Sequence, residues 1–202
     1  IHNDLEIELL KRTPSSYLGS CRFKLPDYNI DEEPYIKAFN LLKKLDIKYF
    51  FYIGGNDSMD TLCKMGEYGR KIGSDIRFVG VPKTIDNDLD GTDHTPGFGS
   101  AAKYIGSVMK EVIRDNKVYG SDLIAVVEIM GRNAGWLTAA SALSKAEDCE
   151  GPEMILLPEI TFDPEKFLSE TVQRHKEKKA FVIAVSEGIM TKDGKYVCEM
   201  NK

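Results

Sequence analysis

Apolar runs of strand length alternate with helix-like segments along most of the chain, and this alternation constrains the fold more than any other feature. Five runs predict strands, at residues 49–53, 76–81, 123–129, 154–157 and 181–185. Between them, apolar residues recur at helical spacing, and Ser58 is placed to cap one of the helices. The pattern predicts an α/β fold, with doubly wound, mostly parallel sheets that carry helices on both faces. The continuous run at 49–53 is expected to be buried on both faces, and 76–81 is expected to form the next buried strand.

Composition excludes several classes of function. The 202 residues are 42% hydrophobic and 29% charged, and no apolar run approaches the ~20 residues that a membrane span requires. The net charge of −5 comes from acids and bases mixed along the chain, so we expect no nucleic-acid partner. The four cysteines lack the spacing of a zinc site, and we expect reduced thiols in a cytoplasmic protein: Cys21, Cys63, Cys149 and Cys198.

Polar or glycine-rich segments follow three of the expected strands, at residues 54–58, 82–93 and 130–135. Ligands of doubly wound sheets collect beyond the carboxyl ends of the strands. The first segment consists of Gly54, Gly55, Asn56, Asp57 and Ser58. Its glycines and the following helix start suit a phosphate, although a tight strand-to-helix turn explains the same residues equally well.

The 82–88 loop carries one cation and two carboxylates, Lys83, Asp86 and Asp88, in a single turn of chain. Phosphoryl transfer requires a base for the attacking hydroxyl, positive charge for the phosphate oxygens and ligands for a metal. On local composition alone, a surface loop rich in Asp and Asn remains the alternative. The loop at 86–97, rich in Asp, Gly, Thr and Pro, is also the best candidate for a domain junction.

Five motifs in this order resemble the successive active-site motifs of phosphofructokinases: Gly-Gly-Asn-Asp-Ser at 54–58, Pro-Lys-Thr-Ile-Asp-Asn-Asp at 82–88, Gly-Thr-Asp at 91–93, Met-Gly-Arg at 130–132 and Ser-Glu-Gly at 186–188. The resemblance implies a glycolytic phosphotransferase acting on fructose 6-phosphate. It further implies a donor-binding and catalytic-loop part at 1–97 and a sugar-phosphate-binding part at 98–202, both incomplete.

The resemblance assigns roles to individual positions of this chain. Asp86 matches the base that deprotonates the C1 hydroxyl of the sugar, and Thr84 and Asp88 match residues beside the transferring phosphoryl group. The 130–132 motif matches residues that hold the sugar phosphate, and Glu187 matches a carboxylate that hydrogen-bonds sugar hydroxyls. The residues expected to hold the sugar phosphate are Met130, Gly131 and Arg132.

Two positions address the phosphoryl donor, which the 54–58 segment is expected to bind together with Lys83. ATP-using relatives have Gly where this chain has Asp57, and usually a small residue in place of Lys83. The pair found here is that of pyrophosphate-using relatives. A carboxylate would obstruct the rest of a nucleotide, while the lysine would neutralise the departing phosphate. The alternatives are an ATP-dependent enzyme and a non-catalytic regulatory subunit or fragment of the same fold.

The resemblance implies Mg²⁺ as cofactor, but the ligands stay open. An acid is usual at the position of Asn56, whose neutral amide is a weaker ligand, and Asp88 is the second candidate. Leu123 replaces an Arg that in bacterial ATP-dependent relatives reaches a neighbouring subunit, so the homo-oligomer expected of the full-length protein need not share their arrangement. Expected family segments would precede residue 1 and follow residue 202, which leaves open whether this portion is active alone.

Overall fold

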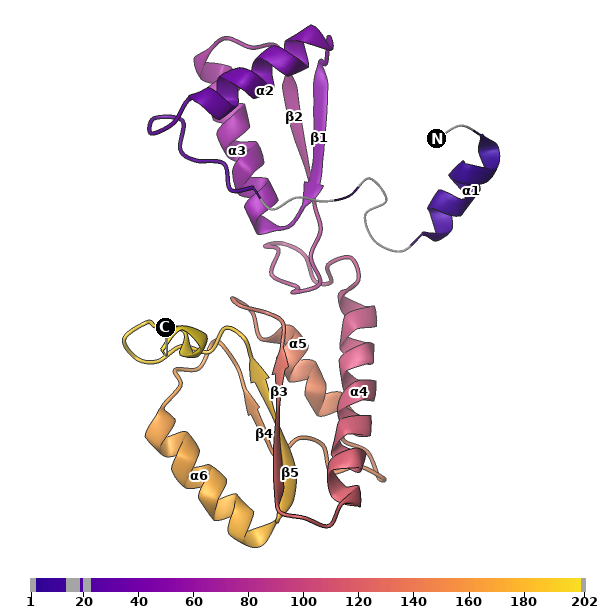
Figure 1. The fold of residues 1–202 in the computed structure, drawn as a ribbon, viewed down its shortest axis with the longest axis vertical. Coiled ribbons are helices and arrows are strands. Elements are labelled where there is room, and N and C mark those ends of the chain that lie inside the picture. Colours follow the sequence, from indigo (N-terminus) through magenta and orange to yellow (C-terminus); the bar gives the residue numbers. More distant parts are fainter. Residues whose placement is uncertain (1–2, 14–18, 20–22, 201–202) are drawn as a thin grey trace. The chain divides into compact units, whose positions relative to one another are not determined.

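The computed structural model describes residues 3–13, 19 and 23–200, which form two compact units (Figure 1). The first unit comprises Ile1–Val81 and the second comprises Pro82–Lys202. The chain therefore divides at the last residue of the second strand, so the 82–97 segment belongs to the second unit. The functional division at 97/98 stays a prediction. Cys21 lies outside the described residues.

In its described residues, the first unit contains a two-stranded sheet and three helices. Its elements are α1 (Asp4–Arg12), α2 (Glu33–Lys44), β1 (Tyr49–Gly54), α3 (Asn56–Lys71) and β2 (Arg77–Pro82). Acidic residues in the first turn and basic residues in the last turn of each helix complement the helix dipole.

The core of the first unit lies on one face of the β1–β2 sheet. Tyr35 and Phe39 of α2 pack with Tyr68 of α3, and partly buried Phe50 and Phe78 from the two strands close the cluster. The alternate side chains of β1, namely Tyr49, Phe51 and Ile53, are each more than 60% exposed. The prediction that 49–53 is buried on both faces is therefore wrong in the described residues, because α2 and α3 cover the same face. The strand predicted at 76–81 is likewise only partly buried, since Val79 and Val81 are exposed.

The second unit contains a three-stranded sheet with helices on both faces. Its elements are α4 (Phe98–Val118), β3 (Leu123–Ile129), α5 (Trp136–Ala139), a 3₁₀ helix (Ala140–Ser144), β4 (Met154–Leu156), α6 (Pro164–Glu177), β5 (Ala180–Ser186) and a 3₁₀ helix (Val197–Glu199). The strand order is β3-β5-β4, and both pairings are parallel.

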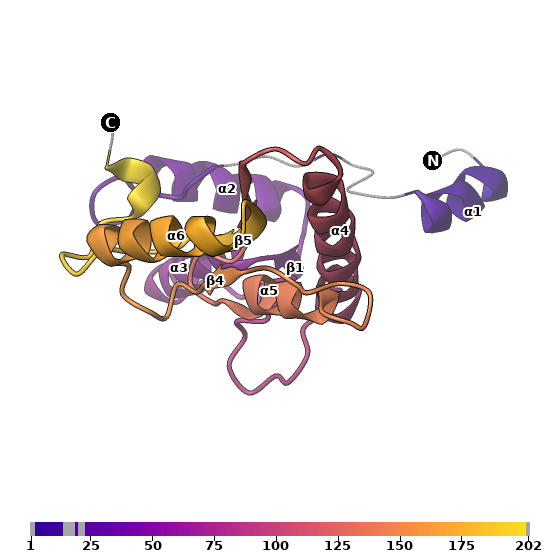
Figure 2. The ribbon, with the colours of Figure 1, turned by 90° about the horizontal axis from the view of Figure 1, so that it is seen from below.

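The central strand β5 joins the two cores of this unit. Its side chains alternate, so Val182 and Ala184 pack in a cluster with α4 and α5, whereas Phe181 and Ile183 pack in a cluster with Phe167 of α6. Figure 2 shows α5 and α6 on opposite sides of the strands. The predicted fold class is thus confirmed in this unit, with all three strands pointing their carboxyl ends toward one edge.

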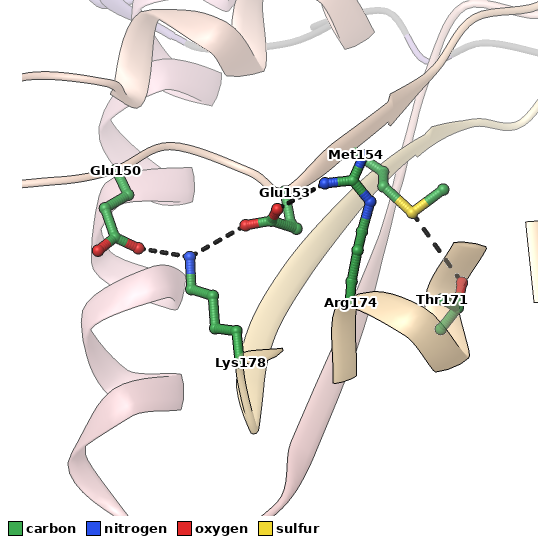
Figure 3. A network of polar contacts seen from close by, with 6 residues as sticks. All are labelled: Glu150, Glu153, Met154, Thr171, Arg174 and Lys178. Carbon is green, nitrogen blue, oxygen red and sulfur yellow. Dashed lines mark hydrogen bonds and ion pairs between the residues drawn. The ribbon is translucent and has the colours of Figure 1, made fainter. Parts of the chain in front are cut away.

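Ion pairs lie at the opposite end of the sheet, where the strands begin. Lys178, which follows α6, contacts both Glu150 and Glu153, and Arg174 donates to Glu153 over 2.7 Å (Figure 3). These groups precede β4 and β5, so the network stabilises the amino ends of the strands. No helix among the described residues is long and apolar enough to cross a membrane.

Candidate active site

The 54–58 turn joins β1 to α3 in the first unit. Gly55 is the N-cap of α3, and its carbonyl accepts the amides of Ser58 and Met59 over 3.0 Å. Ser58 therefore lies in the first turn of the helix, and the prediction that it forms the cap is wrong. Its hydroxyl packs against Gly54, where an added Cβ would lie 2.1 Å away. Asp57 is exposed in the same turn, at the positive end of the helix dipole.

The 82–88 loop follows β2 and is fixed by its own side chains. Buried Thr84 accepts the backbone amide of Asp86 over 3.1 Å. Asn87 adopts a left-handed conformation with φ of 60°, which Asn tolerates better than most residues. Its buried amide group donates to the carbonyl of Asp93 and accepts the amide of Thr95, over 3.2 and 2.9 Å. These contacts hold the acids on either side of Asn87 in one conformation.

Asp86 has an unusual electrostatic environment. Burial raises the pKa of its carboxyl group, and the negative charges of Asp88 and Glu187 raise it further. A hydrogen bond with the Thr84 side chain and the positive charge of Lys83 act in the opposite direction. Among the described residues, the buried Oδ1 of Asp86 makes no hydrogen bond. The carboxylate is thus a stronger base than an exposed Asp.

The loops after β3 and β5 are bound to each other. Glu187 Oε1 accepts the amide of Gly131 over 3.1 Å, and the Ser186 hydroxyl donates to the carbonyl of Gly131 over 2.8 Å. The same hydroxyl accepts the amide of Gly188 over 3.0 Å. A Cβ on Gly188 would lie 1.8 Å from the carbonyl oxygen of Arg132, so only glycine permits this approach. The 130–132 motif and Glu187 therefore share one edge of the sheet.

A second carboxylate holds the far end of the 130–135 loop. Glu159, just beyond β4, accepts the amide of Gly135 over 2.6 Å. The loop that carries Met130 and Arg132 is thus tied to β5 at one end and to the β4 side at the other. Because both tethers accept backbone amides, they fix the path of the loop without occupying the two side chains. Met130 is exposed by 56%, and Arg132 is also exposed.

A cavity of about 130 Å³ opens beside these loops. One guanidinium and three carboxylates line it, together with an aromatic ring and a thiol: Glu128, Arg132, Glu187, Tyr196, Cys198 and Glu199. Hydroxyl groups and an anion can both find partners there, since carboxylates accept and the guanidinium donates.

The structure brings together part of the predicted site. The charges of Asp88 and Glu187 both act on Asp86, and Glu187 is bonded to the 130–132 motif. Lys83 belongs to the second unit and Asp57 to the first. The joint action of this pair on a donor stays a prediction, as do the roles assigned to all the site residues.

Sequence reasoning missed the residues that hold the site in place. Asn87 carried a signal, because Asn between two Asp residues in a turn is a typical left-handed position. Ser186 belongs to the predicted 186–188 motif, but its bond to Gly131, 55 residues away, carried no signal. Glu159 and Tyr196 carried none either, since their partners lie 24 and 64 residues away in the chain. Of the described cysteines, Cys63, Cys149 and Cys198 are free, as expected.

The described part of the chain presents no group of three or more His, Cys, Asp or Glu side chains able to hold a metal ion. Mg²⁺, however, is commonly held by one or two carboxylates together with substrate phosphates. The oxygen-rich 82–88 loop meets that requirement, because Asp88 lies beside Asp86, whose Oδ1 is buried without a hydrogen bond in the described structure.

The carboxyl ends of the strands carry a buried base in the 82–88 loop and the two loops after β3 and β5 that are bonded to each other. This arrangement defines an α/β protein of the doubly wound class, which binds ligands at these strand ends. The chain belongs to the phosphofructokinase family, whose model, described as "Phosphofructokinase", matches residues 2–202.

Two curated relatives named pyrophosphate–fructose 6-phosphate 1-phosphotransferase are similar over nearly the whole chain. The protein of Methylococcus capsulatus is 42% identical and covers 96% of this chain and 46% of its own length. That of Rhodospirillum rubrum is 46% identical and covers 93% and 45%. The pyrophosphate-dependent phosphofructokinase structure from Nitrosospira multiformis matches with a TM-score of 0.77 at 41% identity, covering 96% of this chain and 48% of its own. The chain thus spans about half the length of these relatives.

Proposed function

We propose that the complete protein containing this chain transfers a phosphoryl group from pyrophosphate to the C1 hydroxyl of fructose 6-phosphate, a glycolytic reaction. The observation that carries the proposal is the environment of Asp86, a base with a raised pKa and an unpartnered buried oxygen in a loop beside Glu187. The names of the similar proteins support the same activity.

Three residues of the second unit have separate roles toward the sugar substrate in this proposal. Asp86 accepts the proton of the attacking hydroxyl, which becomes a nucleophile as the proton leaves. Glu187 has one oxygen committed to Gly131, which orients its other oxygen for a sugar hydroxyl. Arg132 offers its guanidinium to the sugar phosphate from the wall of the same cavity.

The donor is proposed from Asp57 and Lys83. Exposed Asp57 adds negative charge at the start of α3, where the remainder of a nucleotide would otherwise be accepted. Lys83 is exposed beside the base and offers its ammonium to the departing phosphate. The amides at the start of α3, beside Gly54 and Gly55, suit a phosphate of the donor.

Mg²⁺ is proposed as the cofactor, with Asp88 and Asn56 as candidate ligands. When bound, the ion neutralises charge on the phosphate oxygens. The carboxylate of Asp88 suits such a hard cation, whereas the amide of Asn56 is the weaker partner of the two. We further propose that the complete protein is a cytoplasmic homo-oligomer. The free cysteines of the described residues, Cys63, Cys149 and Cys198, support a reducing compartment. Sedimentation velocity tests the oligomer.

The test of this proposal compares donors in the complete protein. We expect fructose 1,6-bisphosphate to form with pyrophosphate and not with ATP. In the double variant Asp57→Gly, Lys83→Gly, pyrophosphate turnover should fall and ATP turnover should rise. Asp60→Gly, at an exposed acid one turn further along α3, serves as the matched control. Turnover with ATP and none with pyrophosphate in the unaltered protein would overturn the donor assignment.

A further inference from the structure

A short hairpin follows the 186–188 loop and has no part in the function proposed so far. In this 189–197 hairpin, Met190 and Tyr196 pair as an antiparallel bridge, and the amide of Val197 donates to the carbonyl of Ile189 over 3.1 Å. Gly194, with φ of 75°, allows the tight turn between the two arms. The hairpin therefore brings the chain back to the point where it left β5.

That point lies against Arg132. The backbone of Gly188 touches the carbonyl of Arg132 so closely that a Cβ would lie 1.8 Å from the oxygen. Ile189, which begins the hairpin, is the next residue and is buried. Because the amide of Val197 on the returning arm donates to the carbonyl of Ile189, the backbone places Tyr196 beside Arg132.

The Tyr196 ring faces the Arg132 guanidinium. Arg132 Cζ lies over the ring, 6.0 Å from its centroid, at the outer limit of a cation–π contact. Both side chains line the same cavity as Glu187. Glu128 and Glu199 also line it, yet within the described structure Arg132 forms no ion pair with any carboxylate, and the ring is its side-chain partner.

An aromatic partner has a different consequence from an acidic one. A carboxylate would neutralise the guanidinium and occupy its donors, whereas a ring contacts its face and leaves the in-plane N–H groups free. Since the cavity already holds three carboxylates, a ring is the partner that keeps Arg132 available to an incoming anion.

We propose that Tyr196 is a positioning residue that holds the Arg132 guanidinium over the cavity, with its donors free for the sugar phosphate. The identity of this anion rests on the proposed function. The effect reaches the sugar substrate through Arg132, so the pyrophosphate donor and the chemical step do not depend on it.

The first test measures kinetics of the complete protein with single variants. Tyr196→Leu should raise the KM for fructose 6-phosphate roughly 3- to 30-fold, the range of a cation–π contact, and leave kcat and the KM for pyrophosphate within about twofold. Tyr196→Phe keeps the ring and should behave as the unaltered protein. Tyr119→Leu removes an exposed ring beyond the C-terminal end of α4 and is the matched control. Tyr196→Met is a second ring-free variant should Tyr196→Leu fold poorly.

The second test asks whether Tyr196 acts through Arg132. The Kd for fructose 6-phosphate is measured by calorimetry for Tyr196→Leu, Arg132→Met and the double variant. We expect Tyr196→Leu to weaken binding in the presence of Arg132 and to have no further effect in the Arg132→Met background. Equal losses in both backgrounds, an unchanged Kd in Tyr196→Leu, or equal increases in both KM values would overturn the inference.

Calorimetry also separates this inference from the proposed function. A protein that binds fructose 6-phosphate in a Tyr196-dependent manner but does not turn over pyrophosphate would contradict the function and support the positioning role. A protein that turns over pyrophosphate with no dependence on Tyr196 would support the function and contradict the positioning role. Absence of any sugar-phosphate binding would overturn both.

Discussion

The 54–58 turn of the first unit and the paired loops after β3 and β5 of the second unit each follow the carboxyl end of a strand. They differ in how far apart in the sequence their contacting residues lie. The turn is built within five residues, by Gly55 accepting the first helical amides and Ser58 packing on Gly54. The paired loops depend on Ser186 and Glu187 bonding to Gly131, 55 and 56 residues away. A local phosphate turn thus forms with its helix, whereas the sugar site requires the register of β3 on β5.

The largest expected effect concerns the chemical step and not the contacts that build the turn and the paired loops. Asp86→Ser should lower kcat by roughly 10²- to 10⁴-fold, the usual contribution of a general base, and leave the Kd for fructose 6-phosphate nearly unchanged. Asp90→Ser, at an exposed acid of the same loop, is the control. Steady-state kinetics and calorimetry check the result. Full activity in Asp86→Ser would show that the base lies elsewhere.

The next effect tests whether the sugar site depends on close backbone packing. Gly188→Ala places a methyl group against the Arg132 carbonyl and should lower the free energy of unfolding by about 1–3 kcal/mol, as overpacking does, with weaker fructose 6-phosphate binding. Gly66→Ala in α3 of the first unit meets open space and should raise stability by about 0.5–1 kcal/mol. Denaturant unfolding measures both. A stable, tightly binding Gly188→Ala variant would contradict the packing argument.

A smaller effect concerns the pH profile, which links the 82–88 loop to the paired loops. Asp86 must be ionised to act, so activity falls as the pH drops through its raised pKa. Glu187→Gln removes a charge that raises this pKa, and the acidic limb of kcat/KM should move to lower pH. Lys83→Met removes a charge that lowers the pKa, and the limb should move to higher pH. Shifts of the same sign in both variants would contradict this electrostatic arrangement.

The smallest effect lies at the far edge of the sheet, away from both loops. Lys178, drawn with Glu150 in Figure 3, and Lys117 lower the pKa of Glu150 to about 2. The ion pairs therefore contribute stability above the ordinary pKa of Glu and lose it as the pH falls toward 2. Because Glu150 is largely exposed, Lys178→Ala should lower the free energy of unfolding by less than about 1 kcal/mol at neutral pH.

The control for this network is Lys176→Ala, at an exposed lysine of α6. The free energy of unfolding of the Lys176→Ala variant should match that of the unaltered protein at every pH. The difference between the Lys178 and Lys176 variants should shrink on acidification and at high salt. A difference that persists at pH 2 would show that Lys178 stabilises the sheet by packing instead.

The sequence was sufficient for the features that short-range patterns determine. The strand predicted at 123–129 has the same bounds in the structure, and the family resemblance is confirmed. The prediction failed where neighbours decide burial. The run at 49–53 is apolar throughout, but α2 and α3 cover one face of its sheet only, so alternate side chains are exposed. Gly55 rather than Ser58 caps α3 because the chain enters the helix directly from the strand.

The candidate site divides in the same way. The 82–88 loop was recognisable because its charged residues are adjacent in sequence. The cavity was not, since its walls come from β3, the loops after β3 and β5, the 189–197 hairpin and the 3₁₀ helix that follows it. Tyr196 pairs with Met190 through the backbone alone, as any tyrosine could, and the contact of its ring with Arg132 follows from the folding of the chain around Gly188.

Phosphorus NMR of the complete protein with Mg²⁺, pyrophosphate and fructose 6-phosphate follows the proposed transfer itself. We expect the pyrophosphate signal to decay as inorganic phosphate and a new C1 phosphate ester appear in equal amounts. In Asp86→Ser, neither of these two products should appear on the same timescale. Pyrophosphate that stays intact in the unaltered protein, or that yields only inorganic phosphate, would contradict the proposed transfer.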